Sequence, residues 1–124
     1  QRRGVYDELE KGELVAYLEA QPASFDVAIS ADTLCYFGAL ERFASAAHGA
    51  LRDRGSLVFT VEALPDDAGV EHRLMLHGRY AHARPYLRAV LDAAGFERQR
   101  IDADVLRTEG GVPVQGWVVS AVRA

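Results

Sequence analysis

The sequence is organised around residues 25–62, where two apolar runs flank an amphipathic stretch. The first run, FDVAISA at 25–31, contains β-branched side chains and is followed by a polar residue, which predicts a buried strand. Residues 40–51 place apolar side chains three and four positions apart, which predicts an amphipathic helix that ends around 52–55. SLVFTVE at 56–62 predicts a second strand. Together these runs predict a β-α-β unit with a right-handed crossover.

The segment before this unit carries a weaker pattern. Residues 4–14 are strongly polar and contain a glycine that would break a helix, so their structure stays unassigned. Residues 13–20 favour a short helix that ends before Pro22, because the residue preceding a proline is pushed out of the helical region.

The segment after this unit predicts a long loop, a helix and a hairpin. Residues 64–83, LPDDAGVEHRLMLHGRYAHA, read as a loop, and loops of this length in compact domains are typical of lids or binding segments. Residues 84–94 favour a helix, with Pro85 suited to its first turn and Gly95 to its C-terminal cap. Two strands joined by a glycine turn then predict an antiparallel hairpin. The first strand, the turn and the second strand are residues 96–107, 110–113 and 114–122.

The length of the chain bounds its organisation. At 124 residues it is expected to form one domain, residues 1–124, with a core of its own. This is short for a complete doubly wound α/β enzyme. The chain opens on Gln1 rather than methionine, which favours a fragment of a longer protein.

Composition argues against several classes of partner. With 14 basic and 18 acidic residues and no long basic run, the chain shows no footprint for nucleic acid. Its apolar runs fall short of the roughly 20 residues that a membrane-spanning helix needs, and no signal peptide is visible. The single cysteine, Cys35, excludes an internal disulfide and fits a reducing cytoplasm. These features predict a cytoplasmic protein that binds neither nucleic acid nor membrane.

The order strand, helix, strand, long loop, helix, hairpin resembles the C-terminal half of class I S-adenosylmethionine-dependent methyltransferases. Residues 25–62 are similar to the stretch from that family's fourth strand to its fifth, in which "FD" opens the strand and Asp-x-Leu-x-Tyr follows it. GRYAHARPYLRAVLDAAGF at 78–96 is similar to a segment of a subgroup that acts on small molecules, some of whose members are fused to helical repeats. The resemblance implies a partial Rossmann-like α/β sheet and methyl transfer from S-adenosylmethionine to a small molecule.

One departure from the family limits this expectation. The family's glycine-rich turn and the acidic residue that ends its second strand are absent from the sequence. Gly110 and Gly111 do not replace that turn, because a cofactor-binding glycine turn joins a strand to a helix. By the resemblance, residues 1–3 would end the helix before the family's third strand, and the first two strands would be missing. The chain alone is therefore expected to bind the cofactor poorly.

Sheet geometry predicts where ligand contacts lie. Ligands of open α/β sheets bind beyond the carboxyl ends of the strands, which selects Ser30, Ala31 and Asp32 after the first strand and Glu62 after the second. By the resemblance, residues 30–32 would flank the sulfonium and the substrate entrance. The alternative for Asp32 is that it caps the following helical turn.

A second group of cofactor contacts comes from the resemblance alone. Glu13 and Leu14 fall where the family meets the adenine, with the carboxylate accepting a hydrogen bond from the adenine amino group. The alternative for Glu13 is a solvated glutamate at a helix start, where the helix dipole favours negative charge.

Methyl transfer asks little of catalytic side chains, since positioning the nucleophile for in-line displacement supplies most of the acceleration. A base is needed only when the acceptor arrives protonated. The residues available for base or substrate contact are Tyr36, His77, Tyr80 and His82. We prefer Tyr80 and His82, because they lie in the predicted lid. The alternative is that both anchor the loop against the sheet.

The histidines and the cysteine give no further site. His72, His77 and His82 are spaced by five, so neither a strand nor a helix brings them to one face, and we expect no zinc site. Cys35 has no activating base beside it and is expected to be a small buried side chain.

Two other functional classes fit the same pattern, because a fold does not fix a function. One is half of another nucleotide-dependent Rossmann-like enzyme. The other is a non-catalytic binding or oligomerisation domain whose sheet is completed by a partner or a second copy. Because an unpaired strand edge promotes pairing, we expect self-association through the strand at residues 25–31.

Overall fold

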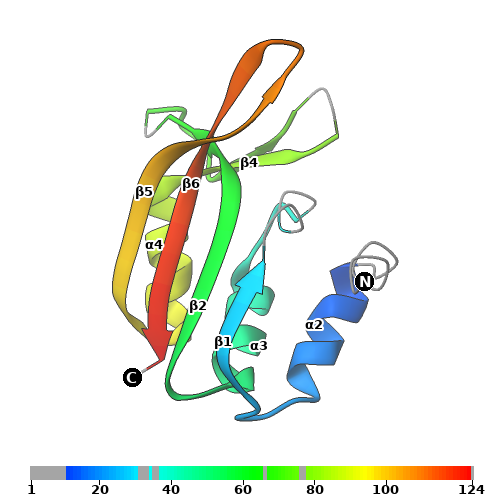
Figure 1. Ribbon diagram of the computed structural model, residues 1–124, viewed down its shortest axis with the longest axis vertical. Helices are drawn as coiled ribbons and strands as arrows, with labels where there is room; N and C mark the ends of the chain where they lie inside the picture. Colours follow the sequence, from blue (N-terminus) through cyan, green and yellow to red (C-terminus); the bar gives the residue numbers. More distant parts are fainter. Residues whose placement is uncertain (1–10, 31–33, 35–36, 66, 76–77, 124) are drawn as a thin grey trace.

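The computed structural model describes residues 11–30, 34, 37–65, 67–75 and 78–123, with only the backbone described at 11–13 (Figure 1). In this part of the chain a mixed sheet is accompanied by three helices. The elements are α2 (Lys11–Glu19), β1 (Phe25–Ser30), α3 (Glu41–Ala50), β2 (Leu51–Leu64), β3 (His72–Leu74), β4 (Tyr80–Ala83), α4 (Arg84–Ala94), β5 (Phe96–Glu109) and β6 (Val112–Arg123).

The predicted β-α-β unit is confirmed. Strands β1 and β2 run parallel, from the pair Phe25 and Leu51 to the pair Ser30 and Phe59. Helix α3 ends at Ala50, before the predicted 52–55, because Leu51 already adopts an extended backbone and pairs with β1. The apolar face predicted for this helix is buried against the sheet, and Phe43 meets Phe59 edge to face at 6.2 Å.

The C-terminal hairpin is also confirmed and determines the sheet order. Strand β6 pairs antiparallel with both β2 and β5, so it lies between them. On its other side β2 pairs with β1 along its first half and with β4 near its end. The sheet is therefore open, with β5 as one edge and with β1 and β3 on the opposite side.

The two faces of this sheet differ in cover. Helices α3 and α4 pack behind the sheet as Figure 1 shows it, and their apolar side chains form one core with the strands. On the other face, Val27 and Ile29 of β1 are 52% and 69% exposed. The prediction that residues 25–31 form a buried strand is therefore wrong, because none of the described helices covers that face.

The stretch predicted as a single long loop contains two short strands. Strands β3 and β4 form an antiparallel pair, and β4 also extends the sheet beside β2. The turn between them is closed by the Met75 N–H, which donates to the Arg79 carbonyl oxygen at 2.8 Å. Strands of three and four residues with mixed polarity give too short a pattern to be recognised in the sequence.

The predicted helices agree with those observed. Helix α4 has the predicted bounds, and it ends at Gly95 with a left-handed φ of 94°, as expected for a glycine C-cap. Helix α2 covers Lys11–Glu19, against the predicted 13–20.

Candidate functional site

The site begins where β2 changes its partner. Strand β1 pairs with β2 as far as Phe59, and β4 takes over at Glu62. Among the described residues, Thr60 and Val61 have no strand partner on this side. The carboxyl ends of parallel strands in open α/β sheets are the usual place for ligands.

Four rings from three elements gather on the helix-covered side of this end. We call them the imidazole–tyrosine cluster: His72 on β3, Tyr80 and His82 on β4, and Tyr86 on α4. His82 and Tyr86 stack with an interplanar angle of 10° and centroids 6.3 Å apart. The His72 ring lies 5.6 to 6.0 Å from the other three rings.

The chain that follows β1 lies against this cluster. The Gly38 carbonyl oxygen lies 2.9 Å from Nε2 of His82. The Tyr86 hydroxyl accepts from the Leu40 N–H at 2.9 Å and donates to Glu41 at 2.8 Å. A Cβ at Gly38 would lie 2.8 Å from Cε1 of Tyr80, so only glycine lets the backbone approach so closely. The cluster is thereby fixed to the loop that leaves β1.

The hydrogen bond from His82 defines its protonation. A carbonyl oxygen only accepts, so Nε2 carries the proton and, in the neutral ring, Nδ1 is an acceptor. Nδ1 has no hydrogen-bond partner among the described residues, although the side chain is fully buried. Burial lowers the pKa of His82, the Gly38 carbonyl opposes this shift, and His72 adds to it. The imidazole is therefore held neutral, and its acceptor atom Nδ1 is unused within the part of the chain that the structure describes.

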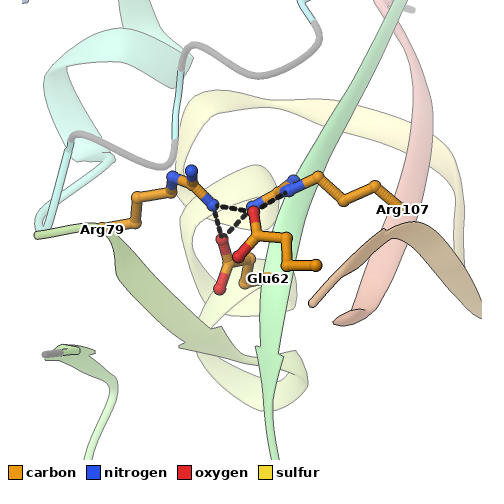
Figure 2. A network of polar contacts seen from close by, with 4 residues as sticks. Glu62, Arg79 and Arg107 are labelled. Carbon is orange, nitrogen blue, oxygen red and sulfur yellow. Dashed lines mark hydrogen bonds and ion pairs between the residues drawn. The ribbon is translucent and has the colours of Figure 1, made fainter. Parts of the chain in front are cut away.

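An ion network occupies the other face at the same end of β2. It consists of Glu62, Arg79, Arg107 and Glu109 (Figure 2). Oε2 of Glu62 lies 2.5 Å from Arg107 and 3.4 Å from Arg79. Oε2 of Glu109 lies 2.6 Å from each guanidinium. The two arginines are thus held between two carboxylates.

A β-bulge places Arg107 in this network. Val105 pairs with Gln115 and Arg107 with Val114, so Leu106 is an extra residue on β5. The insertion moves Arg107 to the opposite face from Val105, which is the face that Glu62 occupies. The neighbouring strand accommodates the bulge at Gly116, where a Cβ would lie 2.3 Å from the Leu106 side chain.

Solved structures show which fold has this architecture. A methyltransferase of Methanosarcina mazei, described as S-adenosylmethionine-dependent, aligns with a TM-score of 0.64 and 16% identity, over 83% of this chain and 61% of its own. The 1,6-didemethyltoxoflavin N1-methyltransferase of Burkholderia thailandensis, solved with its substrate and S-adenosylhomocysteine, gives 0.59 and 21%, over 96% and 48%. The chain has the class I methyltransferase fold.

A third structure with this methyltransferase fold is phosphoethanolamine N-methyltransferase 2 of Haemonchus contortus, in complex with S-adenosylhomocysteine and phosphomonomethylethanolamine. It aligns with a TM-score of 0.61 and 12% identity, over 83% of this chain and 34% of its own. The chain thus spans less than two thirds of each of these methyltransferases. No protein-family model matches the sequence, and no curated protein does.

Within the methyltransferase fold, the predicted site residues fall into three groups. Tyr80 and His82 come together in the imidazole–tyrosine cluster. The Ser30 hydroxyl is buried without a hydrogen-bond partner among the described residues, and Leu14 of α2 belongs to the core. The remaining predicted positions lie outside what the structure describes: Ala31, Asp32, Tyr36, His77 and the side chain of Glu13.

Sequence reasoning missed His72 as a site residue and most of the ion network. His72 was considered only as a metal ligand, and its place among the rings depends on the unpredicted strand β3. Glu62 was selected from sheet geometry, but Arg79, Arg107 and Glu109 were not. The place of Arg107 in the network depends on the bulge, for which the sequence carries no clear signal.

Two further properties bear on the chemistry of this methyltransferase fold. In the residues that the structure describes, no group of three or more histidine, cysteine or acidic side chains is arranged to hold a metal ion. The helices in that same part of the chain are too short or too polar to span a membrane.

Proposed function

We propose that the chain is the C-terminal half of a methyltransferase domain that transfers a methyl group from S-adenosylmethionine to a small molecule. The observation that carries this proposal is the sheet order, in which the last strand, β6, inserts antiparallel between β2 and β5. The similarity to solved methyltransferases supports it. A cytoplasmic location, suggested by the single cysteine, belongs to the same proposal.

The residues of this chain would supply one side of the cofactor site. The buried Ser30 hydroxyl at the end of β1 has no hydrogen-bond partner among the described residues and fits a contact to a polar ligand. We include Glu13, Leu14, Ala31 and Asp32 as cofactor contacts on the family resemblance. S-adenosylmethionine, when bound, supplies the electrophilic methyl group. Since the glycine-rich turn is absent from residues 1–124, we expect this chain alone to bind the cofactor weakly.

His82 and Tyr80 are the proposed substrate contacts, together with Tyr36. The neutral imidazole of His82 offers Nδ1 as an acceptor for a proton on the methyl acceptor. Its lowered pKa keeps this atom unprotonated to a lower pH than in an ordinary histidine. Because the ring is fully buried, the acceptor reaches it only if the neighbouring side chains move, and Tyr80 is the partly exposed ring on the same strand.

Calorimetry on the longer protein that contains this chain tests the proposal. We expect S-adenosylmethionine and S-adenosylhomocysteine to bind that protein, and to bind the isolated chain at least tenfold more weakly. Absence of binding of both compounds to the longer protein would refute the methyltransferase assignment. The coding sequence upstream of Gln1 gives an independent check, because it should encode a strand, a glycine-rich turn and an acidic residue about twenty positions further on.

A binding or oligomerisation domain is the second candidate. The observation that favours it is the apolar uncovered face of β1, where Val27 and Ile29 are exposed. This candidate predicts no cofactor binding by the longer protein, together with stable self-association of the chain. An upstream glycine motif with a hydride-transfer site would instead indicate another nucleotide-dependent enzyme.

A further inference from the structure

We propose that Arg79 and Arg107 bind a carboxylate of the methyl acceptor, and that Glu109 occupies this position until the acceptor displaces it. The inference rests on the proposed function for the identity of the ligand as a methyl acceptor. The anion site itself rests only on the geometry of the ion network.

Glu62 makes the arginine pair independent of Glu109. The Glu62 side chain is only 7% exposed, and both guanidinium groups contact its Oε2. A buried carboxylate needs its positive partners, so it holds the arginines in place even when Glu109 leaves. A pair of arginines oriented in this way is pre-organised for a second anion.

Glu109 is the replaceable member of the network. Its side chain is 39% exposed, against 26% for each arginine. It ends β5 beside Gly110 and Gly111, at which an added Cβ would meet nothing within 4 Å. Withdrawal of this carboxylate therefore needs a change only in the hairpin tip, whereas withdrawal of Glu62 would disrupt the central strand β2.

The charge of the ion network determines which group can replace Glu109. Withdrawal of Glu109 removes one negative charge that contacts both arginines. A carboxylate of the ligand replaces that charge and reproduces the contacts of Oε2 of Glu109 to both guanidinium groups.

The network also lies next to the imidazole–tyrosine cluster. Arg79 immediately precedes Tyr80, and Glu62 pairs with Ala81, the neighbour of His82. The two groups occupy opposite faces of the sheet at the point where the partner of β2 changes from β1 to β4. A small acid anchored by the arginines can therefore extend around the start of β4 towards Tyr80.

Chemical rescue in the isolated chain tests the anion site without cofactor. In Glu109→Ala, we expect acetate to shift the NMR signals of the Nε–H groups of Arg79 and Arg107 saturably. The apparent Kd should be at least tenfold lower than in the unmodified chain, where Glu109 competes. Glu97→Ala, which removes an exposed glutamate from the same strand, is the matched control and should behave like the unmodified chain.

Three outcomes would overturn the proposal. The first is acetate affinity in Glu109→Ala equal to that in Glu97→Ala. The second is retention of acetate binding when the charge-balanced pair Glu62→Gln and Arg107→Gln is added to Glu109→Ala. The third is inorganic phosphate binding tenfold tighter than acetate, which would exclude the carboxylate. If Glu109→Ala does not fold, Glu109→Gln replaces it.

The same design separates this proposal from the proposed function. Acetate rescue reports on the arginine pair whether or not the longer protein binds S-adenosylmethionine. If acetate binds Glu109→Ala but the longer protein binds no cofactor, the anion site is supported and the methyltransferase assignment is refuted. The reverse result would remove only the anion site.

Discussion

The two faces of the sheet hold their polar side chains in different ways. On the helix-covered face, His82 and Tyr86 of the imidazole–tyrosine cluster are buried, and hydrogen bonds to backbone groups hold them in place. On the uncovered face, the ion network is charged and partly buried, and its arginines and glutamates pair with one another. Both lie at the same end of β2, where its partner changes from β1 to β4.

The comparison shows that helix cover on one face of the sheet and its absence on the other favour different charge states of the side chains. Burial keeps His82 uncharged and suited to accept a proton. Exposure lets the arginines keep their charge at a moderate desolvation cost and makes one of their partners exchangeable. Each face should therefore respond to a different perturbation: the first to loss of a hydrogen bond, the second to loss of charge balance.

The largest expected effect is on the charged face. Arg107→Ala removes the guanidinium that lies 2.5 Å from the buried Glu62 carboxylate, whereas Arg79 lies 3.4 Å away, and we expect the free energy of unfolding to fall by about 3 kcal/mol. Urea denaturation followed by circular dichroism measures this change.

Arg100→Ala is the matched control for this prediction. Arg100 lies on the same strand and pairs with Asp102 at 3.3 Å, but both side chains are largely exposed. Its loss should cost less than about 1 kcal/mol. Equal losses for Arg100→Ala and Arg107→Ala would show that burial of Glu62 is unimportant, and the contrast between the faces would disappear.

The contrast itself was only partly predictable. The β-α-β unit, helix α4 and the hairpin followed from apolar periodicity and glycine positions, because these signals are local. The same periodicity did not reveal that Val27 and Ile29 would be exposed. An apolar run predicts a strand, but cover by helices depends on the rest of the fold.

The site was predicted less completely for the same reason. Tyr80 and His82 were selected from their position in a long segment, but Gly38, which accepts a hydrogen bond from His82 and lies close against Tyr80, is about forty residues earlier in the chain. The ion network brings Glu62 and Arg107 together across 45 positions, after a bulge reverses one side chain. Convergence of this kind depends on sheet register, which a single sequence does not specify.

The second effect in size concerns the neutral face. Tyr86→Phe removes the hydroxyl that accepts from the Leu40 N–H and donates to Glu41. Since it leaves a buried backbone donor unpaired, we expect a loss of about 1 to 2 kcal/mol in the free energy of unfolding. Tyr17→Phe, at a residue that is 50% exposed, should leave stability unchanged and serves as the control. A loss equal to that of Tyr17→Phe would contradict the role given to this hydroxyl.

A smaller effect concerns the pH range in which each face loses its contribution to stability. Burial lowers the pKa of His82 below its usual 6.5, so the unfolded state binds more protons and stability falls as the pH drops below 6.5. Glu109 behaves differently, because Arg107 and then Arg79 lower its pKa from 4.5 to about 2, and its contribution is lost between these values.

Two variants assign these pH windows. His82→Gln should flatten the stability profile just below pH 6.5, and Glu109→Gln should flatten it between 4.5 and 2. Burial also lowers the pKa of His48, so His48→Gln is the control for the upper window. If His48→Gln removes the whole slope below pH 6.5, the neutral state of His82 is not a determinant of stability.

The smallest effect on stability, and the sharpest on association, is expected at the exposed part of β1. Ile29 is 69% exposed, so Ile29→Thr should change the free energy of unfolding by no more than about 0.5 kcal/mol. Among the described residues β1 pairs only with β2, which leaves an edge and an apolar face for a second copy or a longer chain. Sedimentation velocity should therefore show self-association of the unmodified chain and a shift towards monomer in Ile29→Thr. If the unmodified chain is a folded monomer at all concentrations, the predicted self-association is wrong. The ion network, and not β1, would then be the binding site on the uncovered face.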